Sequence, residues 1–230
     1  MEVNVSNSNN VPITTNKLTA ANGVSFVSDN NGNTTTQNSR VYTYNQNQRM
    51  IQVVDGAMTA GYTYNGNGQR LKKTVNGTVT VFHYSLNGQI IAESNSAGNV
   101  TAEYVYLNSQ PLAKMEGANT YYYHNDHLAT PQRMTDSTGT VAWAADYKPF
   151  GEATATVSTI TNNLRFPGQY YDAETGLNYN YYRDYSPAIG RYVEAASKNR
   201  RAFWELIRKH DIDVQVSSSR PSNQDNLPPG

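Results

Sequence analysis

Aromatic and polar residues alternate through the middle of the chain in a pattern that returns about every twenty residues. VYTYNQNQRM from Val41 and GYTYNGNGQR from Gly61 each place two aromatic residues two positions apart, then a run of turn-forming residues. Residues two apart share one face of a strand, and Asn and Gly tolerate the positive φ of tight hairpin loops. The pattern predicts an all-β fold, an antiparallel hairpin meander that forms a curved sheet or partial shell.

Further copies extend the array in both directions. VFHYSLNGQI begins at Val81, EYVYLNSQPL at Glu103, a divergent fifth copy YYYHNDHLATPQRM at Tyr121, and a weaker copy VSFVSDNNGNTTT at Val24. One hairpin buries too little surface to be stable alone, so the hairpins must stack into a continuous sheet. Open edges of that sheet would favour self-association or a partner strand. We align the second aromatic of the five clear copies at Tyr44, Tyr64, Tyr84, Tyr106 and Tyr123.

Composition narrows the class of protein. Eighteen Lys and Arg balance eighteen Asp and Glu, so no net field indicates nucleic-acid binding by the repeats. The chain has no cysteine for disulfides or thiolate zinc sites, while 18 tyrosines supply buried area with a polar tip. MEVNVSNSNN lacks the features of a signal peptide, and no apolar run reaches the roughly 20 residues of a membrane span. We expect no cofactor.

A second tyrosine-rich segment, RFPGQYYDAETGLNYNYYRDYSPAIGRY, occupies residues 165–192. It holds seven tyrosines, three glycines and two prolines. Aromatic ladders across strands stabilise a sheet that lacks an aliphatic core. We therefore expect these tyrosines to continue the curved sheet, with Gly168, Gly176, Pro187 and Gly190 bending it.

The repeats resemble the YD repeat of the rearrangement-hotspot (Rhs) family, whose units run Tyr-x-Tyr-Asp/Asn-x-x-Gly-Arg-Leu. YTYNGNGQRLKK is similar to that unit, and residues 121–152 and 165–192 resemble the family's core region. The resemblance covers roughly residues 20–194. It implies a hollow β-shell that encloses a C-terminal toxic domain or another payload, in a protein that is secreted or at the cell surface. The residues that carry the repeat and core motifs are Tyr42, Tyr44, Tyr62, Tyr64, Tyr84, Tyr104, Tyr106, Phe166, Gly168, Tyr171, Asp172, Gly176, Tyr179, Tyr182, Arg183, Tyr185, Gly190, Arg191 and Tyr192.

These patterns divide the chain into five parts. We expect a polar N-terminal segment over 1–20, YD repeats over 21–120 and a core-like region over 121–194. A variable extension with a helix over 195–216 and a disordered tail over 217–230 would follow. Because family shells use many more repeats, we interpret the chain as a remnant or tip of a longer gene, or as a small open sheet.

The end of the core departs from the family pattern. The resemblance implies Asp-Pro-x-Gly segments after the GRY motif, with aspartates that are linked to self-cleavage and payload release. Here GRYVEA leads into ASKNRRAFWELIRKH, and the chain contains no Asp-Pro dipeptide. Arg191 matches an arginine of the core, but its aspartate partners are missing. Without a carboxylate acid–base pair, such a cleavage lacks its chemistry, so we expect neither self-cleavage nor another enzymatic activity.

Other polar clusters are open to a chemical interpretation. His124, Asp126 and His127 could bind a metal, but they occupy the turn of a repeat, where polar residues are expected. Glu152, Asp172, Glu174 and Asp184 could act as glycosidase acids, and their spacing favours no pair.

The tail has a different composition. SKNRRAFWELIRKH, residues 197–210, predicts a short cationic amphipathic helix. Because an isolated short helix is marginal, we expect Phe203, Trp204 and Ile207 to dock on the tyrosine-lined sheet. The alternative is the start of a payload, a truncated nuclease-like toxin in 195–230.

Three functions follow from these observations. The first is a structural shell segment of a secreted toxin or surface protein, whose partners would be further YD-repeat chain or a C-terminal payload. The second is a carbohydrate-binding surface module, because exposed tyrosine rings can stack on surface glycans. The third is a carrier of a toxin in residues 195–230.

Overall fold

The computed structural model describes residues 17–195, and this part of the chain contains strands, turns and loops but no helix. Fifteen strands form one sheet in which every strand pairs antiparallel with the next along the chain. Four further strands form a second sheet in the same sequential order. The all-β antiparallel meander predicted from the repeats is confirmed. The helix expected over 197–210, with Phe203, Trp204 and Ile207, lies outside the described residues.

The strands are short and closely spaced. The first sheet consists of β1 (Ala20–Ala21), β2 (Val24–Ser28), β3 (Thr34–Gln37), β4 (Arg40–Tyr44), β5 (Met50–Asp55), β6 (Met58–Tyr64), β7 (Arg70–Val75), β8 (Thr78–Tyr84), β9 (Ile90–Ser94), β10 (Val100–Leu107), β11 (Gln110–Glu116), β12 (Asn119–Asn125), β13 (Pro131–Thr135), β14 (Val141–Tyr147) and β15 (Ala153–Ser158). The second consists of β16 (Tyr170–Asp172), β17 (Leu177–Asn180), β18 (Arg183–Ser186) and β19 (Arg191–Tyr192). No helix in residues 17–195 has the length and apolar character needed to cross a membrane.

A recurring side-chain turn explains why the hairpins repeat. In the loop before β7, the Asn65 side-chain oxygen accepts hydrogen bonds from the backbone amides of Asn67 and Gln69, both at 3.0 Å. Gly68 completes the loop at a φ of 77°, in the left-handed region that glycine favours. This Asn or Asp turn competes with extended structure and so ends each strand. The same two-bond arrangement recurs at Asn45, Asn95, Asp126 and Asp136.

A tyrosine at the end of most repeats ties each hairpin to the preceding one. The Tyr64 hydroxyl donates to the backbone carbonyl of Met50 at 2.6 Å, and the Tyr84 hydroxyl donates to that of Arg70 at 2.9 Å. We call this set of bonds the tyrosine relay. Its other members are Tyr44 to Thr34, Tyr106 to Ile90 and Tyr147 to Pro131.

The relay corrects the alignment of the fifth copy. Asn125 pairs with Pro131 as Tyr64 pairs with Arg70, and the Asn125 side chain donates to the Pro111 carbonyl at 2.8 Å. Asn125, not Tyr123, therefore takes the second aromatic position, because a side-chain amide can replace the hydroxyl donor. Tyr147 marks a further repeat that was not predicted.

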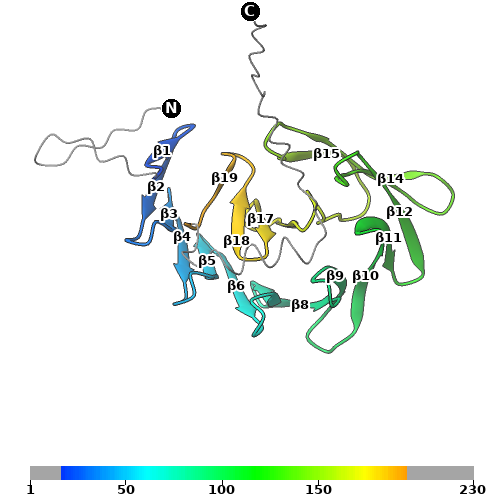
Figure 1. Cartoon of the computed structure of the whole chain (residues 1–230), viewed down its shortest axis with the longest axis horizontal. Coiled ribbons are helices and arrows are strands. Elements are labelled where there is room, and N and C mark those ends of the chain that lie inside the picture. Colours follow the sequence, from blue (N-terminus) through cyan, green and yellow to red (C-terminus); the bar gives the residue numbers. More distant parts are fainter. Residues whose placement is uncertain (1–16, 196–230) are drawn as a thin grey trace, which may run out of the picture. The chain divides into compact units, whose positions relative to one another are not determined.

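The second sheet does not extend the first one. Figure 1 shows β17, β18 and β19 on the inner side of the arc that the first sheet makes within residues 17–195. Tyr170 and Tyr179 pack in one core cluster with Phe82, Tyr104 and Trp143. A second cluster joins Leu177 and Val193 to residues that include Tyr42, Met50 and Val53. The expectation that residues 165–192 continue the curved sheet is wrong, because they form a separate sheet whose Tyr170 and Tyr179 rings are buried against the inner face of the first.

Candidate functional site

Charged side chains occupy two inward positions of β7 where β5 has apolar ones. In β5 the buried inward residues are Met50 and Val53, whereas the matching positions of β7 hold Arg70 and Lys73. The Arg70 side chain is only 1% exposed. A buried charge is stable only when it is paired and hydrogen-bonded, so β7 requires partners from outside its own sheet.

The second sheet supplies these partners. Asp172 accepts two hydrogen bonds from the Arg70 guanidinium, at 2.5 and 2.9 Å, and its own side chain is 1% exposed. Lys73 Nζ lies 3.0 Å from Asp172 Oδ1 and 3.2 Å from Glu174 Oε2. We call Arg70, Lys73, Asp172 and Glu174 the arginine–aspartate cluster. It joins β7 to β16 and the loop that follows, with the two cations facing two carboxylates.

Aromatic rings surround this cluster. The Arg70 guanidinium carbon lies 4.2 Å from the ring centre of Tyr179 and 5.1 Å from that of Tyr62. Burial alone would lower the pKa of Arg70, but the Asp172 charge and its hydrogen bonds raise that pKa well above its ordinary value. The cation is therefore permanent, and the cluster acts as a fixed electrostatic joint.

A second buried acidic site has a different composition. Asp184 on β18 and Glu194 just after β19 are 5% and 4% exposed, and the β18–β19 hairpin brings the two residues together. The Asp184 backbone amide donates to Glu194 Oε2 at 2.7 Å, while Glu194 Oε1 is buried without a hydrogen-bond partner among the described residues. We call these two residues the carboxyl pair.

Burial is the main reason that the carboxyl pair resists ionisation. It raises the pKa of Asp184 to about 6. Burial, together with the neighbouring Asp184 carboxyl, raises the pKa of Glu194 well above its ordinary value. The carboxyl pair was not identified from the sequence, and neither of its residues belongs to an Asp-Pro dipeptide. Glu194 was overlooked because its partner is ten positions away and meets it only through the β18–β19 hairpin.

A third contact joins the repeat turns to the second sheet. Arg49 donates to the backbone carbonyls of Gly68 and Tyr181, and its guanidinium carbon lies 4.6 Å from the Tyr64 ring centre and 4.8 Å from that of Tyr182. The Tyr181 hydroxyl also donates to the Gly88 carbonyl. The turn between β17 and β18 is thus bonded to the repeat turns of Arg49 and Gly88, and Arg49 also bonds to the turn of Gly68 that lies between these two in the sequence.

The repeat-motif residues lie in two layers. Tyr42, Tyr62 and Tyr104 are buried on the inner face of the first sheet, and Tyr179 is buried opposite them in the second sheet. The remaining repeat tyrosines, Tyr44, Tyr64, Tyr84 and Tyr106, form the tyrosine relay.

The core-motif residues lie in the second sheet and its flanks. Tyr185 meets Tyr192 edge-on at 5.3 Å, and the Arg183 guanidinium carbon lies 3.6 Å from the Tyr192 ring centre. Phe166 stacks on Tyr147 at 6.4 Å. The others are Tyr171 beneath Arg165, Arg191 in β19, and Gly168, Gly176 and Gly190, all with positive φ in turns.

The proposed metal ligands do not converge. The Asp126 carboxylate accepts the backbone amides of Leu128 and Thr130 and so forms the turn, while His124 Nε2 contacts Thr135 Oγ1 at 3.0 Å. His127 is exposed in that turn. Residues 17–195 contain no group of three or more His, Asp or Glu side chains placed to hold a metal ion.

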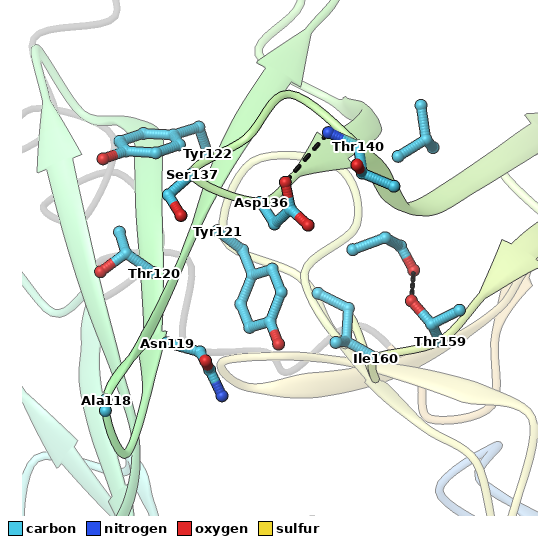
Figure 2. Close-up of a pocket in the computed structure, with 12 residues that line it drawn as sticks. Ala118, Asn119, Thr120, Tyr121, Tyr122, Asp136, Ser137, Thr140, Thr159 and Ile160 are labelled. Carbon is cyan, nitrogen blue, oxygen red and sulfur yellow. Dashed lines mark hydrogen bonds between the residues drawn. The ribbon is translucent and has the colours of Figure 1, made fainter.

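A shallow pocket of about 460 Å³ lies between β12, β14 and the loop after β15. Tyr121, Tyr122 and Asp136 are among the residues that line it (Figure 2). The Asp136 carboxylate already accepts the Thr140 amide at 2.9 Å, and the Thr159 hydroxyl donates to the Ala142 carbonyl at 2.8 Å. The lining has no second carboxylate and no histidine, so it lacks an acid–base pair.

Parts of known bacterial proteins are similar to this chain. A family model described as "RHS protein" matches residues 120–156. The tRNA nuclease WapA of Bacillus subtilis (strain 168) is 34% identical over 188 residues, which cover 77% of this chain and 8% of WapA. The double-stranded DNA deaminase toxin A of Burkholderia cenocepacia (strain H111) is 42% identical over 81 residues, 33% of this chain and 6% of that toxin.

Solved structures share the fold. In the Photorhabdus luminescens Tc holotoxin pore with a mutated TccC3, one chain matches with a TM-score of 0.57 and 21% identity. The match covers 74% of this chain and 9% of that one. This chain thus spans less than a tenth of the length of each of these three proteins.

Proposed function

Because this chain belongs to the RHS family of YD-repeat proteins, we propose that residues 20–194 are a structural segment of the shell of a bacterial toxin. The observation that carries this proposal is the joint between the two sheets. The arginine–aspartate cluster and the aromatic rings around it use the polar groups of the inner face for cohesion. Their role is to hold the curved first sheet against the hairpins of β16–β19.

A segment exchange tests this proposal. Residues 20–194 would replace the homologous segment of Bacillus subtilis WapA, with which they share 34% identity. We expect the chimera to be soluble and to retain tRNA cleavage, because the exchanged segment has a structural role and supplies no catalytic residue. A matched chimera with Arg70→Met should aggregate or lose activity. If the first chimera misfolds although the isolated chain is folded, the shell proposal is wrong.

The missing Asp-Pro segments support a wall that stays intact. The carboxyl pair does not change this expectation, because both carboxyl groups are buried in the fold. Intact-mass spectrometry of the purified 230-residue chain should therefore show no C-terminal fragment after prolonged storage. Appearance of such a fragment in pure protein would reveal cleavage chemistry.

The edge strand β15 is suited to pair with a strand from a further YD-repeat chain. Within the described residues β15 pairs only with β14, and its sequence ATATVS has no charge or proline that would discourage pairing. We assign this edge to a further YD-repeat strand. Light scattering should detect concentration-dependent association that Thr156→Lys abolishes and Thr63→Lys, on the internal strand β6, leaves unchanged.

Glycan binding is a second candidate function. Tyr122 is 44% exposed at the pocket of Figure 2, where its ring is available for stacking on a sugar. A glycan array should then give signals that Tyr122→Ala removes. An array without any Tyr122-dependent signal would leave only the structural role.

A further inference from the structure

The end of the described chain is attached to the beginning of the repeat array. The Val193 amide donates to the Asp184 carbonyl at 2.9 Å, and the Val193 carbonyl accepts the Thr34 amide at 2.7 Å. The Ala195 amide donates to the Asn33 side-chain oxygen at 3.2 Å. Residues 193–195 therefore bridge the second sheet and the first hairpin loop.

The hairpin side of this bridge is rigid. Asn33 is fully buried, and its backbone amide and side-chain nitrogen donate to the two Asp29 carboxylate oxygens at 2.9 and 2.8 Å. The Asn33 side chain also donates to Gln48 at 2.5 Å. By contrast, β19 has two residues and pairs only with β18 among the described strands. Residues 193–195 follow this short strand, with Val193 packed in the second core cluster.

The carboxyl pair lies at the base of this segment without a cation bonded to it. Arg70 on β7 and Arg49 before β5 act on Asp184 through their charge, but their hydrogen bonds go to Asp172 and to backbone carbonyls. Asp172 on β16 adds a like charge, and Tyr44 on β4 faces both acids. Within residues 17–195 neither acid of the pair has an ion-pair partner at 4.0 Å or less.

We propose that the carboxyl pair is a proton-dependent latch for residues 193–195. While the pair retains a proton, Asp184 and Glu194 hydrogen-bond with each other and the segment stays on Asn33 and Thr34. When both acids are ionised, two like charges lie in contact within a buried site, which strongly favours separation. Glu194 then moves outward with its backbone, and residues 193–195 separate from Asn33 and Thr34.

The direction of the pH response follows from the two groups. Burial raises the pKa of Asp184 to about 6 and raises the pKa of Glu194 well above its ordinary value. Because the pair titrates as a coupled unit, its first proton is lost near the lower value and its second at higher pH. The latch is therefore closed in acid and stays closed after the first proton is lost near pH 6. It opens at higher pH, when the second proton is lost and both acids are ionised.

Amide hydrogen exchange of the full chain tests the latch. After correction for intrinsic exchange rates, the Thr34 and Val193 amides should lose at least about tenfold in protection between about pH 5 and about pH 8.5. The Arg70 amide, which donates to the Tyr179 hydroxyl at 2.8 Å, should lose less, because the joint between the sheets stays closed. Equal losses at all three amides would indicate global unfolding and overturn the latch.

Matched variants test whether the pH response comes from the carboxyl pair or from other acidic residues. Glu194→Gln should abolish the pH dependence at Thr34 and Val193, and Asp184→Asn should do the same if Glu194→Gln folds poorly. Glu174→Gln, in the arginine–aspartate cluster, should retain the full wild-type response. A wild-type chain whose Thr34 and Val193 protection does not change with pH would refute the proposal without any variant.

Discussion

Two buried acidic sites lie on the same small sheet but compensate their charge differently. In the arginine–aspartate cluster, Arg70 and Lys73 neutralise Asp172 and Glu174 at distances of 2.5 to 3.2 Å. In the carboxyl pair, Asp184 and Glu194 have no ion-pair partner within residues 17–195, and burial raises the pKa of both acids. The comparison teaches that one fold can use buried carboxylates both as a permanent joint and as a titratable one.

Removing the Arg70 cation from the arginine–aspartate cluster should have the largest effect on the free energy of unfolding. Arg70→Met leaves Asp172 buried beside Lys73 alone and opens the bond between β7 and β16. We expect a loss of about 3–5 kcal/mol in the free energy of unfolding, measured by urea denaturation. A loss below about 1 kcal/mol, the range of exposed pairs, would show that the two sites do not differ as described.

A change of pH should alter stability mainly through the carboxyl pair. Because the folded pKa of Asp184 is raised from 3.8 to about 6, folding binds protons, and stability is full in acid and falls as the pH rises through about 6. The expected loss is about 2–3 kcal/mol, since one pKa unit corresponds to about 1.4 kcal/mol. This loss should be seen between about pH 4 and about pH 8, and the urea midpoints of Asp184→Asn should be nearly equal at these two pH values. A wild-type-like decline in Asp184→Asn would assign the pH effect to another group.

A smaller change tests how much uncharged neighbours contribute to the stability of the arginine–aspartate cluster. The Tyr62 hydroxyl donates to Glu174 Oε1 at 3.1 Å, so Tyr62→Phe removes one bond to a charged group and keeps the ring. We expect a loss of about 1 kcal/mol in the free energy of unfolding. Tyr122→Phe is the matched control, because its exposed hydroxyl has no hydrogen-bond partner within residues 17–195.

An exposed ion pair gives the baseline for both sites. Lys148 and Glu152 interact at 3.0 Å with side chains that are 63% and 38% exposed. Lys148→Met should change the unfolding free energy by less than about 0.5 kcal/mol, because solvent screens such pairs. A loss comparable to that of Arg70→Met would mean that burial is not what distinguishes the joint.

The hairpins could be predicted from the sequence because their signals are local. The Tyr-x-Tyr spacing and the Asn and Gly turns act within a few residues, so the antiparallel meander follows from the repeat alone. Asn125 escaped this reasoning because its role depends on a hydrogen bond to Pro111, fourteen residues earlier, and not on residue type.

The joint could not be predicted because it is long-range. Arg70 and Asp172 are 102 residues apart, and no period relates them. One signal was present in the sequence. Arg70 and Lys73 stand where β5 has Met50 and Val53, so an apolar face was interrupted by two cations that needed acidic partners.

The tyrosine relay has a mechanical consequence. Each hydroxyl bonds to the carbonyl of the hairpin before it, so a pulling force passes from one hairpin to the next in series. Stability in such arrays is a sum of neighbour terms, and a stretched sheet should therefore yield one hairpin at a time. Single-molecule extension would record a staircase of small steps, and the wall would dissipate load gradually instead of rupturing at once.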